Sequence, residues 1–175
     1  IKGSIPNPPL QLAAMLTDKL NETGIWVKNE PNVIWSDTKS RKSTTILQIQ
    51  SPPLSEIVKV LNMESINLYA EVLLLHLAKN GGNNKSIEAG CNVLTKFWAS
   101  KGMDTTGLFL HDASGLSRAN GITPRQMAFV LNYIGSKSPE SEFFIESLPV
   151  SGTSGNMQNY YKEVSGKFQA KSGYM

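Results

Sequence analysis

Apolar side chains recur at helical spacing along most of this chain. In residues 7–25, Leu12, Met15 and Leu16 repeat every three or four positions, after prolines suited to a first helical turn and before a glycine suited to a helix end. The same spacing predicts further helices in residues 51–62, 65–82, 84–102 and 123–136. In the last of these, Thr123 occupies the N-cap position and Pro124 the first helical position.

Strand patterns are fewer and shorter. Residues 25–27 and 44–50 are rich in β-branched and apolar side chains, residues 108–110 form a strand edge before a loop, and residues 168–174 alternate in polarity. Residues 29–43 are polar and rich in turn formers, which predicts a loop or the remnant of an inserted connection. Because helices dominate and do not alternate with strands, the fold class predicted is α+β.

Composition excludes several classes of protein. The chain has 175 residues, 40% of them hydrophobic and 18% charged, which suits one domain with a core. The longest apolar run, residues 72–78, is far too short for a membrane span, and the opening residues lack the apolar stretch of a signal peptide. A single cysteine, Cys91, excludes an internal disulfide. Because the chain has only two histidines, His76 and His111, in addition to this cysteine, we expect no metal site and no cofactor.

The charge balance is mildly basic. The net charge is +3, and the only dense basic run is Lys39–Lys42, which is typical of a solvated loop. A nucleic-acid binder usually carries a basic stripe interleaved with aromatic residues, so we expect no nucleic-acid partner. A weakly positive surface is compatible with an anionic polymer such as bacterial cell wall.

Ser65 and Asn67 form a Ser-x-Asn pair at the start of a strongly periodic helix. Two interpretations remain open. In the first, Ser65 is an N-cap whose hydroxyl accepts a backbone hydrogen bond, and Asn67 is a polar residue of the first turn. In the second, both side chains project into one cleft, where the hydroxyl passes a proton and the amide holds a peptide carbonyl.

Residues 111–124 form a loop of small and turn-forming residues before the last helix. Arg118 lies within this loop. Its guanidinium either presents a bidentate donor to a substrate carboxylate or packs the loop.

Three segments, in this order, carry a resemblance to a known family: "SPPLSEIVKVLNMESINLYAE", "HDASGLSRANGITPRQM" and "AKSGYM". They resemble the D-alanyl-D-alanine carboxypeptidases of the low-molecular-mass class C penicillin-binding proteins. The residues before the first segment are similar to the family's as well, so the resemblance covers nearly the whole chain. It implies a penicillin-binding-protein or β-lactamase-like transpeptidase fold, in which a helical subdomain accompanies an antiparallel sheet flanked by helices.

The resemblance also implies roles for the residues that match the family's motifs. Ser65 would shuttle a proton, Asn67 would hold the substrate amide and Lys171 would supply a positive field. Ser172, Gly173 and Tyr174 would bind the substrate, with the Ser172 hydroxyl on the terminal carboxylate, Gly173 leaving room along the strand and the Tyr174 N–H in the oxyanion hole. Arg118 would lie near the substrate's side-chain end.

The chain departs from the family pattern at three places. Ser172 replaces a threonine and Ala113 a glycine, both mild changes. The third departure is serious and concerns the nucleophilic Ser-x-x-Lys motif. Its sole match in this sequence, Ser36–Lys39, lies in a polar stretch without helical periodicity. We therefore expect that residues 1–175 are the later portion of one transpeptidase-like domain and that the nucleophile lies outside this chain, upstream of Ile1. Residues 1–175 alone are expected to be inactive.

The expected function is a serine-type D-Ala-D-Ala carboxypeptidase of the periplasm or extracellular cell envelope, with endopeptidase action left open. Its partners would be peptidoglycan peptides and β-lactam antibiotics. The alternatives are a cell-wall-binding member of the same fold that lost its nucleophile, and a basic surface-binding protein whose motifs arose by chance.

Overall fold

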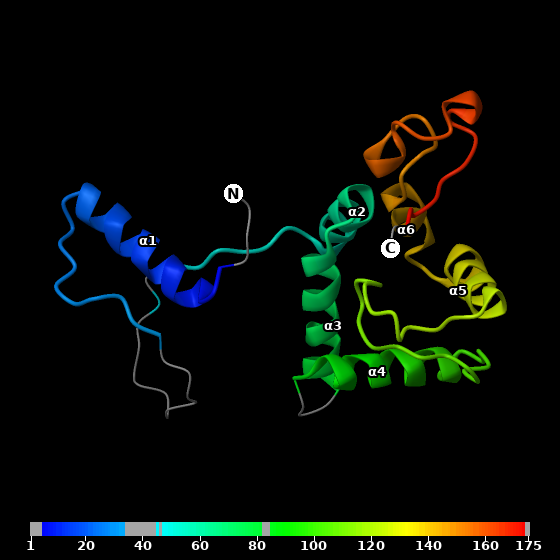
Figure 1. The fold of residues 1–175 in the computed structure, drawn as a ribbon, viewed down its shortest axis with the longest axis horizontal. Helices are drawn as coiled ribbons and strands as arrows, with labels where there is room; N and C mark the ends of the chain where they lie inside the picture. Colours follow the sequence, from blue (N-terminus) through cyan, green and yellow to red (C-terminus); the bar gives the residue numbers. More distant parts are fainter. Residues whose placement is uncertain (1–4, 34–44, 46, 82–84, 174–175) are drawn as a thin grey trace. The chain divides into compact units, whose positions relative to one another are not determined.

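The computed structural model describes residues 5–33, 45, 47–81 and 85–173. The chain divides into two units, residues 1–49 and residues 50–175. Figure 1 shows the helices of both. Each unit has its own architecture.

The first unit contains the helix α1, Pro8–Glu22. The Asn7 side chain accepts a hydrogen bond from the Leu10 N–H at 3.2 Å, which caps the helix start as expected for an N-cap asparagine. After the C-cap residue Thr23, Gly24 adopts a φ of +85°, a conformation that favours glycine. The helix prediction for residues 7–25 is thus confirmed.

The second unit contains α2 (Leu54–Glu64), α3 (Asn67–Gly81), α4 (Ile87–Ser100), α5 (Pro124–Lys137) and α6 (Ser141–Ser147), with two short 3-10 helices, η1 (Gly155–Met157) and η2 (Lys162–Val164). All four helices predicted in this part of the chain are present. The short elements α6, η1 and η2 were not predicted, because three to seven residues are too few to show a clear period.

The core of this unit forms where α3 packs against α4 and α2 packs against α6. Leu74 and Ala78 of α3 are each 1% exposed, and Cys91 of α4 is buried as well. Gly90 makes the close packing of these two helices possible, because a Cβ built there would lie 2.6 Å from both the Cγ and the carbonyl oxygen of Leu74.

The predicted strands are the main correction. No strand ladder forms among the described residues, and antiparallel pairing is reduced to two isolated bridges, Phe109 with Gly121 and Val150 with Gln169. Residues 25–27, and residues 45 and 47–50 of the predicted strand 44–50, are not strands. Alternation of side chains describes one strand, but a ladder also needs a partner backbone, which the local sequence does not specify.

The sheet flanked by helices that the family resemblance implied is therefore absent from the described residues. Residues 34–44, which contain the Ser36–Lys39 match and the basic run Lys39–Lys42, lie outside the described part of the chain. Among the helices that the structure describes, none combines the length and apolarity needed to cross a membrane.

Candidate active site

Ser65 occupies a special backbone position at the end of α2. Its N–H donates to the Leu61 carbonyl as the C-cap of that helix, and its φ of 56° and ψ of 50° are left-handed. The residue directly before α3 is Ile66, so the interpretation of Ser65 as an N-cap is wrong. A non-glycine residue in this region costs roughly 1 kcal/mol, and such outliers concentrate at functional sites.

Lys171 lies in an extended segment that is anchored by backbone hydrogen bonds. The Ser151 N–H donates to the Phe168 carbonyl and the Ala170 N–H to the Pro149 carbonyl, each at 3.0 Å. These bonds hold the residues just before Lys171 against residues 149–151. Ser151, the last of these, is 0% exposed. The lysine therefore extends from a fixed backbone rather than from a free tail.

The two residues meet although 106 positions separate them in the sequence: Lys171 Nζ donates to Ser65 Oγ at 2.8 Å. The same ammonium donates to the Ser172 carbonyl, also at 2.8 Å. The Lys171 side chain as a whole is exposed, but partial loss of hydration around the ammonium lowers its pKa. A hydroxyl oxygen held by a lysine of lowered pKa is an arrangement suited to proton transfer.

The other motif residues lie beside this pair in sequence. Asn67 opens α3 two positions after Ser65 and is exposed, Ser172 is half-buried and Gly173 is exposed. Tyr174 lies outside the described residues. The structure therefore shows a Ser65–Lys171 contact directly and places Asn67, Ser172 and Gly173 next to its two members along the chain.

The loop before α5 is held by a carboxylate. Asp112 accepts hydrogen bonds from the Gly115 N–H at 2.8 Å, the Ser117 N–H at 2.7 Å and the Asn120 side chain at 2.7 Å. Burial by itself raises the pKa of Asp112, but these hydrogen bonds to the ionised form outweigh it and the pKa is lowered. The loop conformation therefore depends on an ionised Asp112.

A second carboxylate ties the same loop to α3. Glu71 Oε1 accepts from the Ser114 N–H at 3.0 Å. Arg118 is exposed, and in the part of the chain that the structure describes no hydrogen bond or ion pair engages its guanidinium. Asp112 and Glu71, rather than Arg118, shape the loop, which leaves the arginine available to a ligand.

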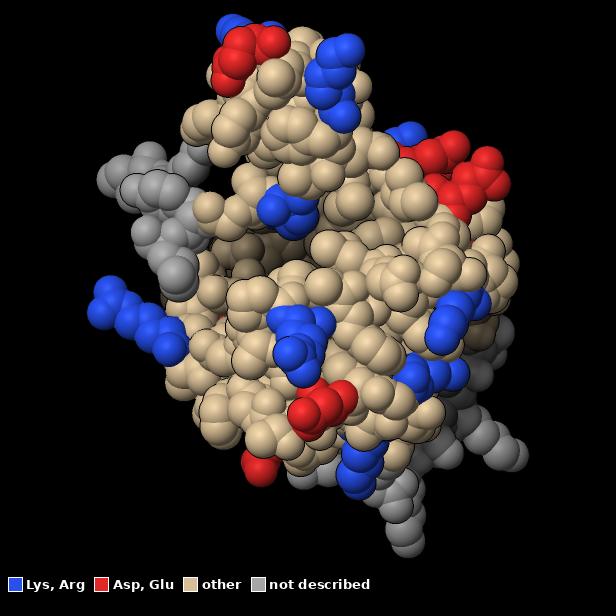
Figure 2. Space-filling model, turned by 90° about the vertical axis from the view of Figure 1, so that its right-hand side faces the viewer, with Lys and Arg blue, Asp and Glu red and all other residues tan. Residues whose placement is uncertain are grey.

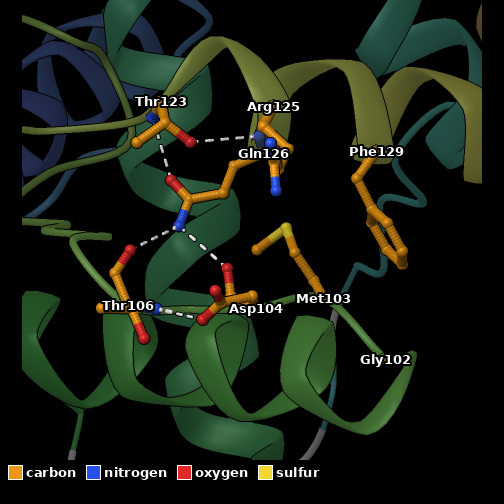
Figure 3. Close-up of a pocket in the computed structure, with 8 residues that line it drawn as sticks. All are labelled: Gly102, Met103, Asp104, Thr106, Thr123, Arg125, Gln126 and Phe129. Carbon is orange, nitrogen blue, oxygen red and sulfur yellow. Dashed lines mark hydrogen bonds between the residues drawn. The ribbon is translucent and has the colours of Figure 1, made fainter.

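A hollow of about 460 Å³ lies between the end of α4 and the start of α5 (Figure 3). The buried Gln126 side chain forms its wall, donating to the carbonyls of Asp104 at 2.9 Å and Thr106 at 3.1 Å while accepting from the Thr123 N–H. This hollow contains none of the residues predicted for the site. The Gln126 side chain uses both its oxygen and its nitrogen within the fold, and with Thr123 it forms a capping box that joins a loop to a helix.

No group of three His, Cys, Asp or Glu side chains in the described ranges could hold a metal ion. On the face drawn in Figure 2, Lys and Arg side chains are dispersed among uncharged residues and do not form a continuous stripe.

Comparisons with known proteins agree with the resemblance in the sequence. The model of the D-Ala-D-Ala carboxypeptidase 3 (S13) family matches residues 2–175. Carboxypeptidase DacB of Mycolicibacterium smegmatis is 33% identical over 140 residues, which cover 76% of this chain and 30% of that protein. The D-alanyl-D-alanine carboxypeptidase of Actinomadura sp. strain R39 is 27% identical over 98% of this chain and 33% of that protein.

Among solved structures, penicillin binding protein 4 (dacB) from Haemophilus influenzae, complexed with a β-lactam, superimposes with a TM-score of 0.84 at 24% identity. The match covers 99% of this chain and 40% of that one, and it confirms the expected penicillin-binding-protein fold for the part of the fold present here. This chain spans about a third of the length of the curated relatives. It belongs to the D-Ala-D-Ala carboxypeptidase 3 (S13) family.

Proposed function

We propose that this chain is the later part of a serine-type D-Ala-D-Ala carboxypeptidase that acts on peptidoglycan stem peptides through an acyl-serine intermediate. The observation that carries the proposal is the 2.8 Å hydrogen bond from Lys171 to Ser65, which joins two motifs of the family across the fold. Family membership and the carboxypeptidase names of the relatives support the reaction class.

In this proposal the nucleophile is a serine of a Ser-x-x-Lys segment in the full-length protein, other than residues 36–39. Its oxygen attacks the carbonyl of the penultimate D-Ala, the peptide C–N bond breaks, and the leaving D-Ala nitrogen takes a proton through Ser65. Water then hydrolyses the acyl-serine ester. A β-lactam carbonyl enters the same first step and leaves the serine acylated.

Lys171 serves this chemistry in two ways. Its ammonium supplies a positive field that stabilises the negative charge developing on the attacked carbonyl. Its hydrogen bond also holds the Ser65 hydroxyl, so that the oxygen is oriented before substrate arrives. A lowered pKa makes the lysine's proton easier to share with Ser65.

The remaining motif residues are assigned to binding. Asn67 holds the substrate amide, the Ser172 hydroxyl binds the terminal carboxylate, and Gly173 lets the substrate lie along the backbone where a Cβ would obstruct it. The Tyr174 N–H completes the oxyanion hole. Arg118, exposed within the loop before α5, contacts the side-chain end of the stem peptide.

The setting follows from the substrate. Peptidoglycan lies outside the cytoplasmic membrane, so we place the full-length protein in the periplasm or on the extracellular side of the bacterial envelope. Endopeptidase action on peptide cross-links uses the same acyl-serine step with a longer leaving group, and it is an additional activity to be assayed.

Covalent labelling of the full-length protein with a fluorescent penicillin tests the proposal. The label should attach to one serine outside residues 1–175, and Ser65→Ala and Lys171→Ala should each slow labelling by on the order of 10²-fold or more, as expected for loss of a proton-transfer group. Lys167→Ala, which removes an exposed lysine four positions away, is the matched control and should label at the wild-type rate.

A folded protein that takes up no label would contradict the carboxypeptidase proposal. It would instead favour a cell-wall-binding member that lacks a nucleophile.

A further inference from the structure

A buried polar pair joins α2 to α6. The Asn62 side chain is 8% exposed and donates from Nδ2 to Ser147 Oγ at 2.7 Å, while Ser147 is 1% exposed and donates in turn to the Phe144 carbonyl at 2.6 Å. Among the described residues, this is the one side-chain hydrogen bond that joins α2 to α6. A buried hydrogen bond fixes both the rotation and the slide of one helix against another, because a misaligned pair leaves an unsatisfied polar group.

Each member of the pair stands close to one half of the Ser65–Lys171 contact. Asn62 lies on the last turn of α2, three positions before Ser65. On the other side, Ser147 ends α6, and Pro149 just after it accepts the Ala170 N–H at 3.0 Å. The Gln169 side chain donates to the Ile145 carbonyl of α6 at 2.8 Å, so two hydrogen bonds attach the residues before Lys171 to α6 and the segment that follows it.

Packing around η1 restrains the same end of α2. A Cβ built on Gly155 of η1 would lie 2.8 Å from the Met63 carbonyl oxygen and 3.1 Å from the Met63 Cα. The backbone of η1 therefore packs closely against the backbone of Met63. The last turn of α2 has little freedom to move without breaking the Asn62–Ser147 hydrogen bond.

We propose that Asn62 and Ser147 are positioning residues: their buried hydrogen bond sets the distance between Ser65 on α2 and Lys171 beside α6. The path runs from Ser65 along one helical turn to Asn62, across to Ser147, and through the Pro149–Ala170 hydrogen bond to Lys171. The effect of the pair on acylation rests on the function proposed above, whereas its effect on the distance between Ser65 and Lys171 does not.

The kinetic test uses the full-length protein and four variants. Asn62→Ala and Ser147→Ala each remove one partner, and Asn62→Leu combined with Ser147→Ala replaces both by apolar groups, a change that is often nearly neutral for stability and so protects against failure to fold. The control is Gln126→Ala, because Gln126 is also buried, at 4% exposed, and also makes buried hydrogen bonds, yet it lies outside the path between Ser65 and Lys171.

For each variant, the acylation rate constant with a β-lactam is separated from the dissociation constant of the initial non-covalent complex. We expect the acylation constant to fall by on the order of 10- to 100-fold in all three variants of the pair, since a misplacement of about 1 Å has that effect, with the dissociation constant little changed. Gln126→Ala should acylate normally at temperatures where it is folded. Equal slowing in Gln126→Ala, or normal acylation in the folded pair variants, would overturn the proposal.

An independent readout follows the lysine itself. In protein carrying ¹⁵N-lysine, the Lys171 side-chain signal is assigned by its disappearance in Lys171→Arg. In the pair variants this signal should move toward its position in Ser65→Ala, and in Gln126→Ala it should stay at the wild-type position. A signal that stays in place in the pair variants refutes the positioning role. If the wild-type protein takes no β-lactam, the function proposed above fails, and the NMR result still decides the role of the pair.

Discussion

Gly90 offers the sharpest test of how this fold is packed. It lies where α4 meets α3, and a Cβ added there would lie 2.6 Å from the Leu74 Cγ, 2.6 Å from the Leu74 carbonyl oxygen and 2.9 Å from the Leu74 Cδ1. A side chain can rotate away from a new methyl group, but a carbonyl oxygen within a helix cannot. Gly90→Ala must therefore push the two helices apart.

The expected cost follows from two opposing terms. Overpacking of a buried site costs typically about 1–3 kcal/mol. Replacing glycine by alanine inside a helix returns about 0.5–1 kcal/mol, because alanine loses less backbone entropy on folding. We expect Gly90→Ala to lower the free energy of unfolding by about 1–2 kcal/mol, which corresponds to a fall of roughly 2–8 °C in Tm for a chain of this size.

The assay is thermal unfolding followed by circular dichroism, with Gly135→Ala as the matched control. Gly135 is also within a helix, α5, but nothing lies within 4 Å of a Cβ built there. This second variant should raise Tm slightly, since only the helix-propensity term acts. If both substitutions raise Tm, the close approach at Gly90 does not constrain the packing of α3 on α4, and the reasoning is refuted.

Three further predictions concern the candidate site. Ser65→Gly should unfold at a higher temperature than Ser65→Ala, by the equivalent of about 1 kcal/mol, because only glycine adopts a φ of 56° without strain; equal midpoints would show that the position is not strained. If acylation needs a protonated Lys171, its rate should decline as pH rises through the Lys171 pKa, which is lowered below 10.5. The arginine in Lys171→Arg stays charged, so the residual activity of this variant should not show the decline in pH–rate profiles. Asp112→Ala should lower stability by about 1–3 kcal/mol at neutral pH. Because the folded pKa of Asp112 is lowered, its contribution is complete above its unfolded pKa of about 3.9 and is lost as pH falls through the folded pKa, so the wild type and variant should converge in Tm in acid.

Local signals in the sequence were enough to locate the long helices. Proline in a first turn, a capping threonine followed by glutamine at the third helical position, and glycine of positive φ after a helix end all act within a few residues. For that reason α5 begins at Pro124 after Thr123, as predicted. The motifs of the family were equally visible, since they consist of neighbouring residues.

Ser65 shows where local reasoning stops. A serine before a periodic apolar run is a common N-cap, yet here it ends the preceding helix in a left-handed conformation. Two helices joined by a very short connection compete for the same residue, and packing of α2 against α6 and η1 decides where the first one ends. Asn62 and Ser147 were likewise missed, because a polar residue that will be buried looks like any other polar residue of an amphipathic helix.

By itself, the sequence determined the family, the long helices and the identity of the polar side chains that the chemistry needs, because these depend on residues that are close together along the chain. The tertiary structure decided that the Lys171 ammonium reaches the Ser65 hydroxyl, at 2.8 Å. It also decided that, in the part of the chain that the structure describes, two of the predicted strands form a single bridge each and the others form none. Both outcomes depend on which distant backbone segments come into contact. The contacts that form are those that bury α3 against α4 and α2 against α6. The free energy of that burial depends on all of these helices together, so it cannot be obtained from any single stretch of residues.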